Sequence, residues 1–333
     1  MILVVGATGY VGRYLCPYLK NKGYSVLALG RSKKGQEFLE SHDIPFQYFD
    51  LGEKEPFAKL ELKEKVDAIV DLSACLAELE TPVERFFEVN TLGVYKVLEY
   101  ARVQGIKKVV ITSSHKVYND IPKKVISEAD GISFTGDHSP YIISKIAAEN
   151  FATYYNKDFD MKAVVLRLTG VHGYGEILGQ LYDDGSYKKS TFEIFFEKAL
   201  AGEDIEVWGD QTIVRDHIYI KDVLSAIEAG VNSGDAKGIY NIAMGKGFSQ
   251  YDEAVAVAEI FATDKVSKVT IDESKPGLKR GYVYDITKAE NELNWKPVYD
   301  DMYKMYTDYK KEWISKEYHN FHQINEEDRP KTL

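Results

Sequence analysis

The chain opens with Ile2-Leu3-Val4-Val5-Gly6-Ala7-Thr8-Gly9-Tyr10-Val11-Gly12, an apolar run followed directly by three glycines spaced three apart. The run predicts a short buried strand, and residues 14–19 predict a helix despite Pro17. A glycine turn between a strand and a helix lets the backbone approach a pyrophosphate, to which the helix N-terminus offers N–H groups. The stretch therefore predicts a dinucleotide site, although its spacing is Gly-x-x-Gly-x-x-Gly. A turn that only tightens strand–helix packing is the alternative.

Further short, β-branched runs follow this first strand, with helical stretches between them. They lie at residues 25–29, 46–49, 68–72, 108–112 and 163–168. Such alternation predicts an α/β fold, with a doubly wound parallel sheet covered by helices on both faces. Ligands of such folds bind at the carboxyl ends of the strands.

A second stretch, Ser139-Pro140-Tyr141-Ile142-Ile143-Ser144-Lys145, predicts the chemistry. Ser139 suits a helix N-cap and Pro140 the first helical position, so Tyr141 and Lys145 should share one face of the opening turns. An ammonium about 4 Å from a phenol lowers its pKa by at most roughly three units from about 10. With an oxidised nicotinamide ring nearby, Tyr141 could act as a general acid or base. A chance pair is the alternative, because the chain has 24 Tyr.

Composition limits the classes of function. The chain has 333 residues, with 42 Lys and Arg against 52 Asp and Glu, and its net charge of -10 argues against nonspecific binding of nucleic acid. Cys16 and Cys75 are isolated and predict reduced thiols; we expect no metal site. There is no signal-like start and no apolar run near about 18 residues, so we expect a cytoplasmic protein without a membrane partner.

Several segments in a fixed order resemble extended short-chain dehydrogenases/reductases of the NAD(P)-dependent epimerase/dehydratase group, most of which modify nucleotide sugars. They are Gly6 to Gly12, Asp50-Leu51, Leu72-Ser73-Ala74, Val89-Asn90-Thr91-Leu92-Gly93, Thr112 to Tyr118, Tyr141 to Lys145, Leu166-Arg167, Arg215-Asp216, Tyr240-Asn241-Ile242 and Trp295-Lys296-Pro297. The resemblance implies a Rossmann-type domain over residues 1–168 plus about 210–242. It also implies a smaller C-terminal substrate-binding lobe, over residues 169–209 and 243–333.

The resemblance also implies roles for three catalytic residues. Ser114 would orient a sugar oxygen, Tyr141 would give or take the proton, and Lys145 would hold the nicotinamide ribose. Hydride would move between the cofactor and a sugar carbon, commonly C4. Thr112 and Ser113 are the alternative hydroxyls to Ser114.

The second strand ends in Arg31-Ser32-Lys33-Lys34, where NAD-selective sites usually carry an acidic residue. Three cations and a hydroxyl suit a 2′-phosphate, so we expect NADP(H), with NAD(H) possible; a solvated basic turn is the alternative. The cofactor-binding residues expected in full are Gly6, Thr8, Gly9, Tyr10, Val11, Gly12, Arg31, Ser32, Lys33, Asp50, Leu51, Leu72, Ser73, Ala74, Asn90, Thr112, Tyr141, Lys145 and Leu168.

A nucleotide-sugar substrate is expected to contact Ser114, His115, Tyr141, Arg215 and Arg280. The two arginines stand where relatives bind the diphosphate, and a surface ion pair is the alternative. Relatives often carry Asn where this chain has Gly170, which puts the usual UDP-sugar pose in doubt. A lone His, such as His115 or His172, is read first as a hydrogen-bonded neighbour.

The residues after Ser114 and the expected cofactor bear on which reaction is catalysed. Dehydratases of the group commonly carry an Asp-Glu pair where this chain has His115-Lys116, so a 4,6-dehydratase is disfavoured. Exchangeable NADPH favours a 4-keto-sugar nucleotide reductase. A nucleotide-sugar 4-epimerase is the alternative, and a non-catalytic NADP-binding redox sensor is an alternative of another class. The resemblance also implies a homodimer, formed through residues 83–104 and 139–156.

Overall fold

The computed structural model describes residues 1–76, 81–119, 121–132, 138–175, 179–181 and 187–318. Within them, a seven-stranded parallel sheet has the order β13-β7-β5-β4-β1-β2-β3. Its strands are β1 (Ile2–Val5), β2 (Val26–Gly30), β3 (Phe46–Tyr48), β4 (Ala68–Asp71), β5 (Lys108–Ser114), β7 (Lys162–Leu168) and β13 (Gly238–Ile242). The predicted doubly wound sheet is confirmed, and the six strands expected from the sequence differ from the observed bounds by at most two residues.

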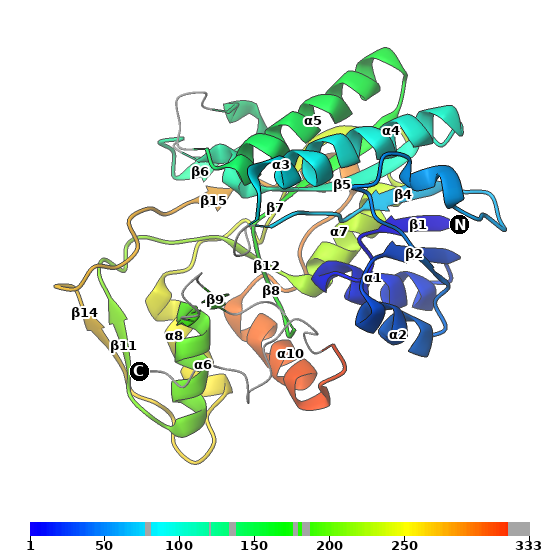
Figure 1. Cartoon of the computed structure of the whole chain (residues 1–333). Coiled ribbons are helices and arrows are strands. Elements are labelled where there is room, and N and C mark those ends of the chain that lie inside the picture. The colour runs from blue at the N-terminus through cyan, green and yellow to red at the C-terminus, as the bar shows by residue number, and fades with distance from the viewer. Residues whose placement is uncertain (77–80, 120, 133–137, 176–178, 182–186, 319–333) are drawn as a thin grey trace.

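Both faces of this sheet are buried, which explains why its strands are continuous apolar runs. Side chains alternate along each strand: Leu3 and Val5 pack into one core, and Ile2 and Val4 into the other. The first core is covered by α4 (Leu92–Val103) and α5 (Pro140–Asp158). Helices α1 (Tyr10–Asn21), α2 (Lys33–Ser41) and α7 (Ile220–Asn232) cover the second (Figure 1).

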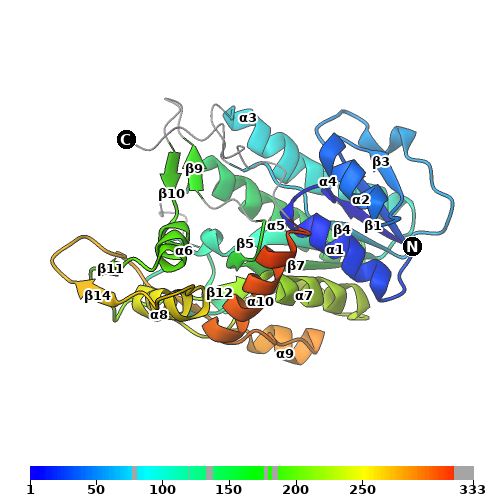
Figure 2. The same ribbon diagram turned by 90° about the horizontal axis from the view of Figure 1, so that it is seen from below.

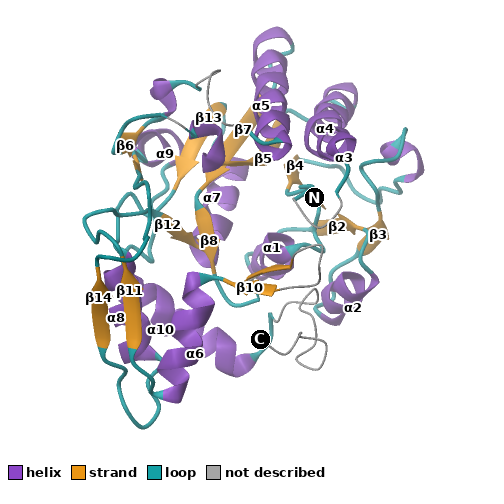
Figure 3. Cartoon of the chain, turned by 60° about the vertical axis from the view of Figure 1, so that its left-hand side comes forward, coloured by secondary structure: helices purple, strands orange, loops and turns teal. Residues whose placement is uncertain are grey.

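The remaining strands form small two-stranded sheets outside the main one. They pair as β6 (Val125–Ile126) with β15 (Val283–Tyr284), β8 (Gly170–His172) with β12 (His217–Tyr219), β9 (Gly179–Leu181) with β10 (Tyr187–Lys189), and β11 (Ile205–Trp208) with β14 (Val269–Asp272). Helices α6 (Thr191–Ala201), α8 (Gln250–Ile260) and α10 (Met302–Ser315) pack together beside β11 and β14 (Figure 3). The short helix α3 (Val83–Phe86) leads into α4 through a π-helical turn at Phe87–Thr91.

The division of the chain into two parts stays a prediction, but individual elements can be placed. In the stretch 210–242, α7 covers the main sheet and β13 forms its edge, whereas β12 pairs with β8 outside it. Helix α9 (Thr287–Leu293) lies in a segment that the sequence assigned to the lobe, yet it packs against β13 and α7 (Figure 2). Over the described part of the chain, no helix has both the length and the apolar character that a membrane span requires.

Two glycines explain how the first turn is closed. Gly6 has φ +77°, and a Cβ there would stand 2.9 Å from the backbone of Leu72 and Ser73. A Cβ on Gly12 would stand 2.5 Å from the carbonyl oxygen of Ala7. Side chains at these positions would push α1 and the end of β4 away from the turn.

A buried ion pair joins α5 to the central strands. The guanidinium of Arg167 on β7 donates to both carboxylate oxygens of Glu149 on α5, at 2.9 and 2.5 Å. The Ser113 hydroxyl on β5 donates to the same carboxylate at 2.6 Å. Burial alone would lower the pKa of Arg167, but the hydrogen bond and charge of Glu149 outweigh it and raise that pKa. The pair therefore ties the helix that carries Tyr141 to the strands beneath it.

We predict that Arg167→Met and Glu149→Leu each lower the free energy of unfolding by about 3–5 kcal/mol, because each leaves a buried charge without its partner. The double variant should lose clearly less than the sum, as measured by urea unfolding. The exposed pair Arg102 and Glu99 is the control, and breaking it should cost about 1 kcal/mol or less. Additive losses at the buried pair would contradict the coupling.

Candidate active site

The parallel sheet brings most of the predicted cofactor-binding residues to one edge. Since neighbouring parallel strands end on the same side, the segments that follow them lie next to one another. Those segments supply Gly6, Thr8, Gly9, Tyr10, Val11 and Gly12 after β1; Arg31, Ser32 and Lys33 after β2; Asp50 and Leu51 after β3; Leu72, Ser73 and Ala74 after β4; and Thr112 and Leu168 from the ends of β5 and β7. The others, Asn90, Tyr141 and Lys145, come from the π-helical turn and from α5.

The first turn suits the diphosphate of a dinucleotide. Gly9 is the N-cap of α1, no described side chain caps that end, and its first turn carries no acidic residue. The N–H groups and the positive end of the helix dipole therefore face the turn. The Thr8 side chain is turned inward: a Cβ on Gly30 or Gly35 would stand within 2.7 Å of it. Thr8 can accordingly contribute its backbone rather than its hydroxyl.

The predicted phosphate-binding cations at the end of β2 are exposed but partly engaged. An Arg31 nitrogen lies 3.5 Å from the Asp50 carboxylate, which Arg85 approaches from the other side, also at 3.5 Å. Burial would raise the pKa of Asp50, but the Gly52 N–H and the two guanidiniums lower it overall. The Ser32 hydroxyl caps α2 by accepting from the Gly35 N–H at 3.2 Å, so it is less available to a ligand.

Helix α5 positions Tyr141 as the sequence predicts. The Ser139 hydroxyl caps the helix by accepting from the Ile142 N–H at 3.5 Å, and Pro140 is its first residue. The Tyr141 phenol faces the Ser114 hydroxyl at the end of β5. Burial raises the pKa of Tyr141, and the nearby Ser114 hydroxyl offsets this in part. The structure therefore brings together the two groups expected to share a substrate oxygen.

Lys145 lies one turn further along α5 than Tyr141. Its ammonium is buried and donates to the Thr112 carbonyl at 3.0 Å. Burial lowers the pKa of Lys145, against the opposing charges of Asp71 and Glu149. The buried ammonium is directed to a carbonyl, and its expected effect on the pKa of the Tyr141 phenol, with a nicotinamide ring nearby, stays a prediction.

Asn90 connects the segment after β4 to the active-site helix. It is fully buried, exchanges two hydrogen bonds with the backbone of Cys75, and donates to the Ser144 hydroxyl at 3.0 Å. Thr91 adds a bond to the Ser144 carbonyl. Three hydrogen bonds of its amide thus link Asn90 to α5 and to the segment after β4, and its predicted contact with the cofactor stays a prediction.

Two adjoining cavities lie beyond Tyr141, and Arg215 lines both. The larger, of about 480 Å³, is also lined by His115, Lys116, Arg280 and Ile142. The smaller, of about 210 Å³, is bounded by the N-termini of α6 and α8, where Ser190 and Ser249 are the N-caps. Two helix N-termini and a guanidinium form a suitable site for an anion such as a diphosphate.

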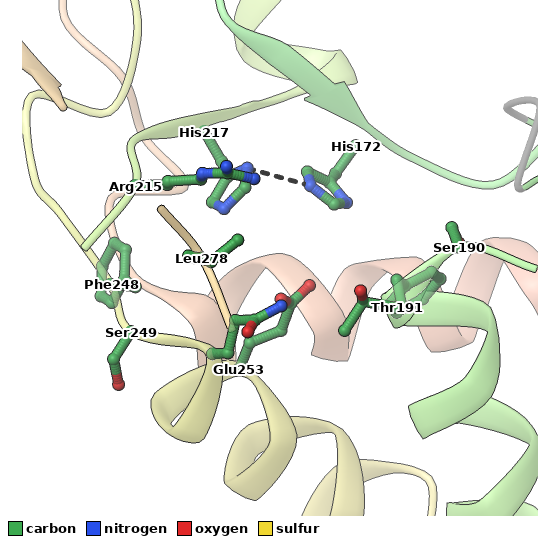
Figure 4. Close-up of a pocket in the computed structure, with 11 residues that line it drawn as sticks. His172, Ser190, Thr191, Arg215, His217, Phe248, Ser249, Glu253 and Leu278 are labelled. Carbon is green, nitrogen blue, oxygen red and sulfur yellow. Dashed lines mark hydrogen bonds between the residues drawn. The ribbon is translucent and has the colours of Figure 1, made fainter. Parts of the chain in front are cut away.

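The smaller cavity also contains two hydrogen-bonded imidazoles (Figure 4). His172 Nε2 lies 3.1 Å from His217 Nδ1, and Glu253 lies across the cavity from them. Burial lowers the pKa of His172 to about 4 and that of His217 well below its usual range. Burial raises the pKa of Glu253, which accepts a bond from the Tyr306 hydroxyl at 2.7 Å. At neutral pH Arg215 is therefore the main positive charge here.

His115 and Arg280 have partners within the protein. His115 Nδ1 lies 2.9 Å from the Tyr284 hydroxyl, and burial lowers its pKa to about 3. Arg280 donates to the carbonyl oxygens of Tyr118 and Ile121, at 3.3 and 2.8 Å. These two hydrogen bonds hold the segment that follows Ser114, and the Arg280 side chain also lines the larger cavity.

Lys116, His217 and Glu253 are among the cavity residues that were not predicted from the sequence. The position of Lys116, two residues after Ser114, was a signal for it. Nothing in the local sequence indicates that α8 brings Glu253 next to two histidines, because that contact depends on how the elements pack. Across the residues that the structure describes, no group of three or more His, Cys, Asp or Glu side chains could hold a metal ion.

Comparisons with known proteins agree with this fold. A protein of Methanocaldococcus jannaschii described as a putative UDP-glucose 4-epimerase is 28% identical over 90% of this chain and 94% of its own length. A solved UDP-glucose 4-epimerase from Thermotoga maritima, with UDP-glucose, matches with a TM-score of 0.70 and 24% identity, over 94% of this chain and 99% of that one. A solved dTDP-glucose 4,6-dehydratase from Bacillus anthracis, in complex with NAD, matches with a TM-score of 0.72 and 22% identity, over 95% and 96%.

These relatives give no support to the predicted NADP preference, nor to the reductase that the sequence analysis favoured over an epimerase. The protein-family model described as "NAD dependent epimerase/dehydratase family" matches residues 2–243, which is more than half of the chain. Together with the sheet topology and the Tyr141 site, this match confirms the resemblance found in the sequence. The chain belongs to the NAD-dependent epimerase/dehydratase family.

Proposed function

We propose that this protein is a nucleotide-sugar 4-epimerase. The observation that carries the proposal is that Tyr141, at the start of α5, and Ser114, at the end of β5, lie at the sheet edge that bears the glycine turn and beside a cavity lined by cations. The relative from M. jannaschii is described as a putative UDP-glucose 4-epimerase, which supports this reaction over reduction of a keto sugar.

Each side chain of the site has its own role in the proposed reaction. A nicotinamide dinucleotide, when bound, supplies a hydride acceptor that also returns the hydride. Tyr141 removes the proton from the sugar hydroxyl, and later returns it, while the Ser114 hydroxyl orients the same oxygen. Lys145 offers its ammonium to the nicotinamide ribose and limits the cost of the charge that forms on Tyr141. Arg215, with the N-termini of α6 and α8, holds the diphosphate.

A keto-sugar reductase and a redox sensor are the two other candidate functions. A reductase would need exchangeable NADPH. Arg31 and Lys33 support this function, because their positive charges suit the 2′-phosphate of NADPH. A redox sensor would need no proton donor, whereas Ser114 and Tyr141 form a donor pair at the cleft.

We predict that the purified protein converts UDP-glucose to UDP-galactose without net change in cofactor absorbance at 340 nm. Product is measured by chromatography with NAD added. Net consumption of NADPH with a 4-keto-sugar nucleotide would instead identify a reductase. Tight binding of the dinucleotide without either reaction would identify a sensor.

Replacing Tyr141 by Phe should lower turnover by about 10²–10⁴-fold, because the proton acceptor is lost. Binding of the dinucleotide, followed by intrinsic fluorescence, should change little. Tyr154→Phe is the control, since Tyr154 lies on the same helix and is 48% exposed. Turnover retained in the Tyr141 variant would exclude the phenol as the proton acceptor.

For the cofactor, the chain's own charges still favour NADP: Arg31 and Lys33 are exposed and the first turn of α2 carries no acidic residue. The family's description and the dehydratase complex name NAD. Arg31→Ala should weaken NADPH binding about tenfold or more while leaving NADH almost unchanged, since a charge-assisted bond to phosphate is lost. Arg85→Ala, which frees the same Asp50 carboxylate, is the control. Equal losses for both cofactors would reject an NADP preference.

A further inference from the structure

The larger cavity, next to Tyr141, carries an excess of positive charge. Lys116, Arg215 and Arg280 all line it, and none of its described lining residues is acidic. Within the described part of the chain, no carboxylate lies within ion-pair distance of any of these three cations. A cavity with three cations and no counter-charge of its own is suited to a ligand with several negative charges.

The neutral groups of the cavity do not alter this balance. His115 adds no charge at neutral pH, since burial and the neighbouring cations Lys116, Arg215 and Arg280 lower its pKa to about 3. Its ring is hydrogen-bonded to the Tyr284 hydroxyl. The charge of the cavity therefore comes from the lysine and the two arginines.

These cations differ in position. Arg215 faces both cavities, its Nε donates to the Arg280 carbonyl at 3.3 Å, and the Arg280 guanidinium is held by two backbone carbonyls. Both arginines suit the diphosphate, which joins the nucleoside to the sugar. Lys116 is exposed, and its Nζ lies 6.0 Å from the centre of the Tyr141 ring. This cation therefore lies near the proposed proton acceptor.

The backbone of Lys116 is held by the turn that follows Ser114. Its backbone N–H donates to the Ser114 hydroxyl at 3.2 Å, so the lysine and the proposed catalytic serine share one 3₁₀ turn, His115–Tyr118. In a hexopyranose the carbon next to C4 is C5, which carries the C6 substituent. A charged C6 group would therefore lie within a few bonds of the oxygen that Ser114 and Tyr141 hold.

We propose that this cavity takes a nucleotide sugar with a carboxylate at C6, a nucleotide hexuronate, and that Lys116 determines this specificity by binding the carboxylate. The proposal rests on the proposed epimerase function and narrows its substrate class. A neutral hydroxymethyl group at C6 would leave the ammonium without an ionic partner, whereas a carboxylate would form a charge-assisted hydrogen bond with it.

The test compares sugars that differ only at C6. UDP-glucose and UDP-glucuronate, and the corresponding dTDP and GDP pairs, are assayed for 4-epimerisation, and their dissociation constants are measured by calorimetry. We expect kcat/KM to be about ten- to a hundredfold higher for the uronate, as loss of a hydrogen bond to a charged group implies. Lys116→Gln should abolish this preference mainly through KM, and Lys116→Arg should restore much of it.

Lys124→Gln is the matched control, because Lys124 is exposed and lies outside both cavities. Equal kcat/KM for the two sugars, or a preference that survives in Lys116→Gln, would overturn the uronate proposal while the epimerase function stands. An equal fall of kcat for both sugars, with a shifted pH profile, would mean that Lys116 acts on Tyr141 and would also overturn it. If no sugar nucleotide of any pair is bound or turned over, the epimerase function itself is overturned.

Discussion

The buried contact between Glu149 and Arg167 is the interaction on which the site most depends. It joins α5 to β7, and the Ser113 hydroxyl extends it to β5. Ser114 directly follows Ser113, and Tyr141 lies two turns before Glu149 on α5. The distance between the phenol and the serine hydroxyl is thus controlled by a hydrogen-bond network beneath them, in which both carboxylate oxygens of Glu149 accept bonds.

The parallel sheet adds a second constraint. Because all its strands run in one direction, the glycine turn, the basic segment after β2 and the Ser114 turn must emerge at the same edge. The small sheets outside it bring Arg215 and Arg280 to this edge from more than 90 residues further along the chain than Ser114. The cofactor side is therefore built by local segments, and the substrate side by long-range packing.

This difference explains what could be predicted from the sequence. The turn at Gly6 and the capped start of α5 follow from local patterns, and the structure has both. The pairing of Ser114 with Tyr141 came from the family resemblance, and the structure places the two residues near each other. The direction of the Lys145 ammonium could not be predicted, since it depends on whether the Thr112 carbonyl is free to accept. The engagement of Arg31 by Asp50 and the meeting of His172 with His217 likewise require contacts between distant segments.

Arg215 stands in the wall between the two cavities, and this has a consequence for how a ligand is retained. A molecule that fills only one cavity loses its full translational freedom on binding, but it gains only the contacts of that cavity. A molecule with a moiety in each cavity loses that freedom once, so its second half binds at a high effective concentration. The protein should accordingly discriminate by molecular span, retaining the intact sugar nucleotide while releasing the free nucleotide or the free sugar.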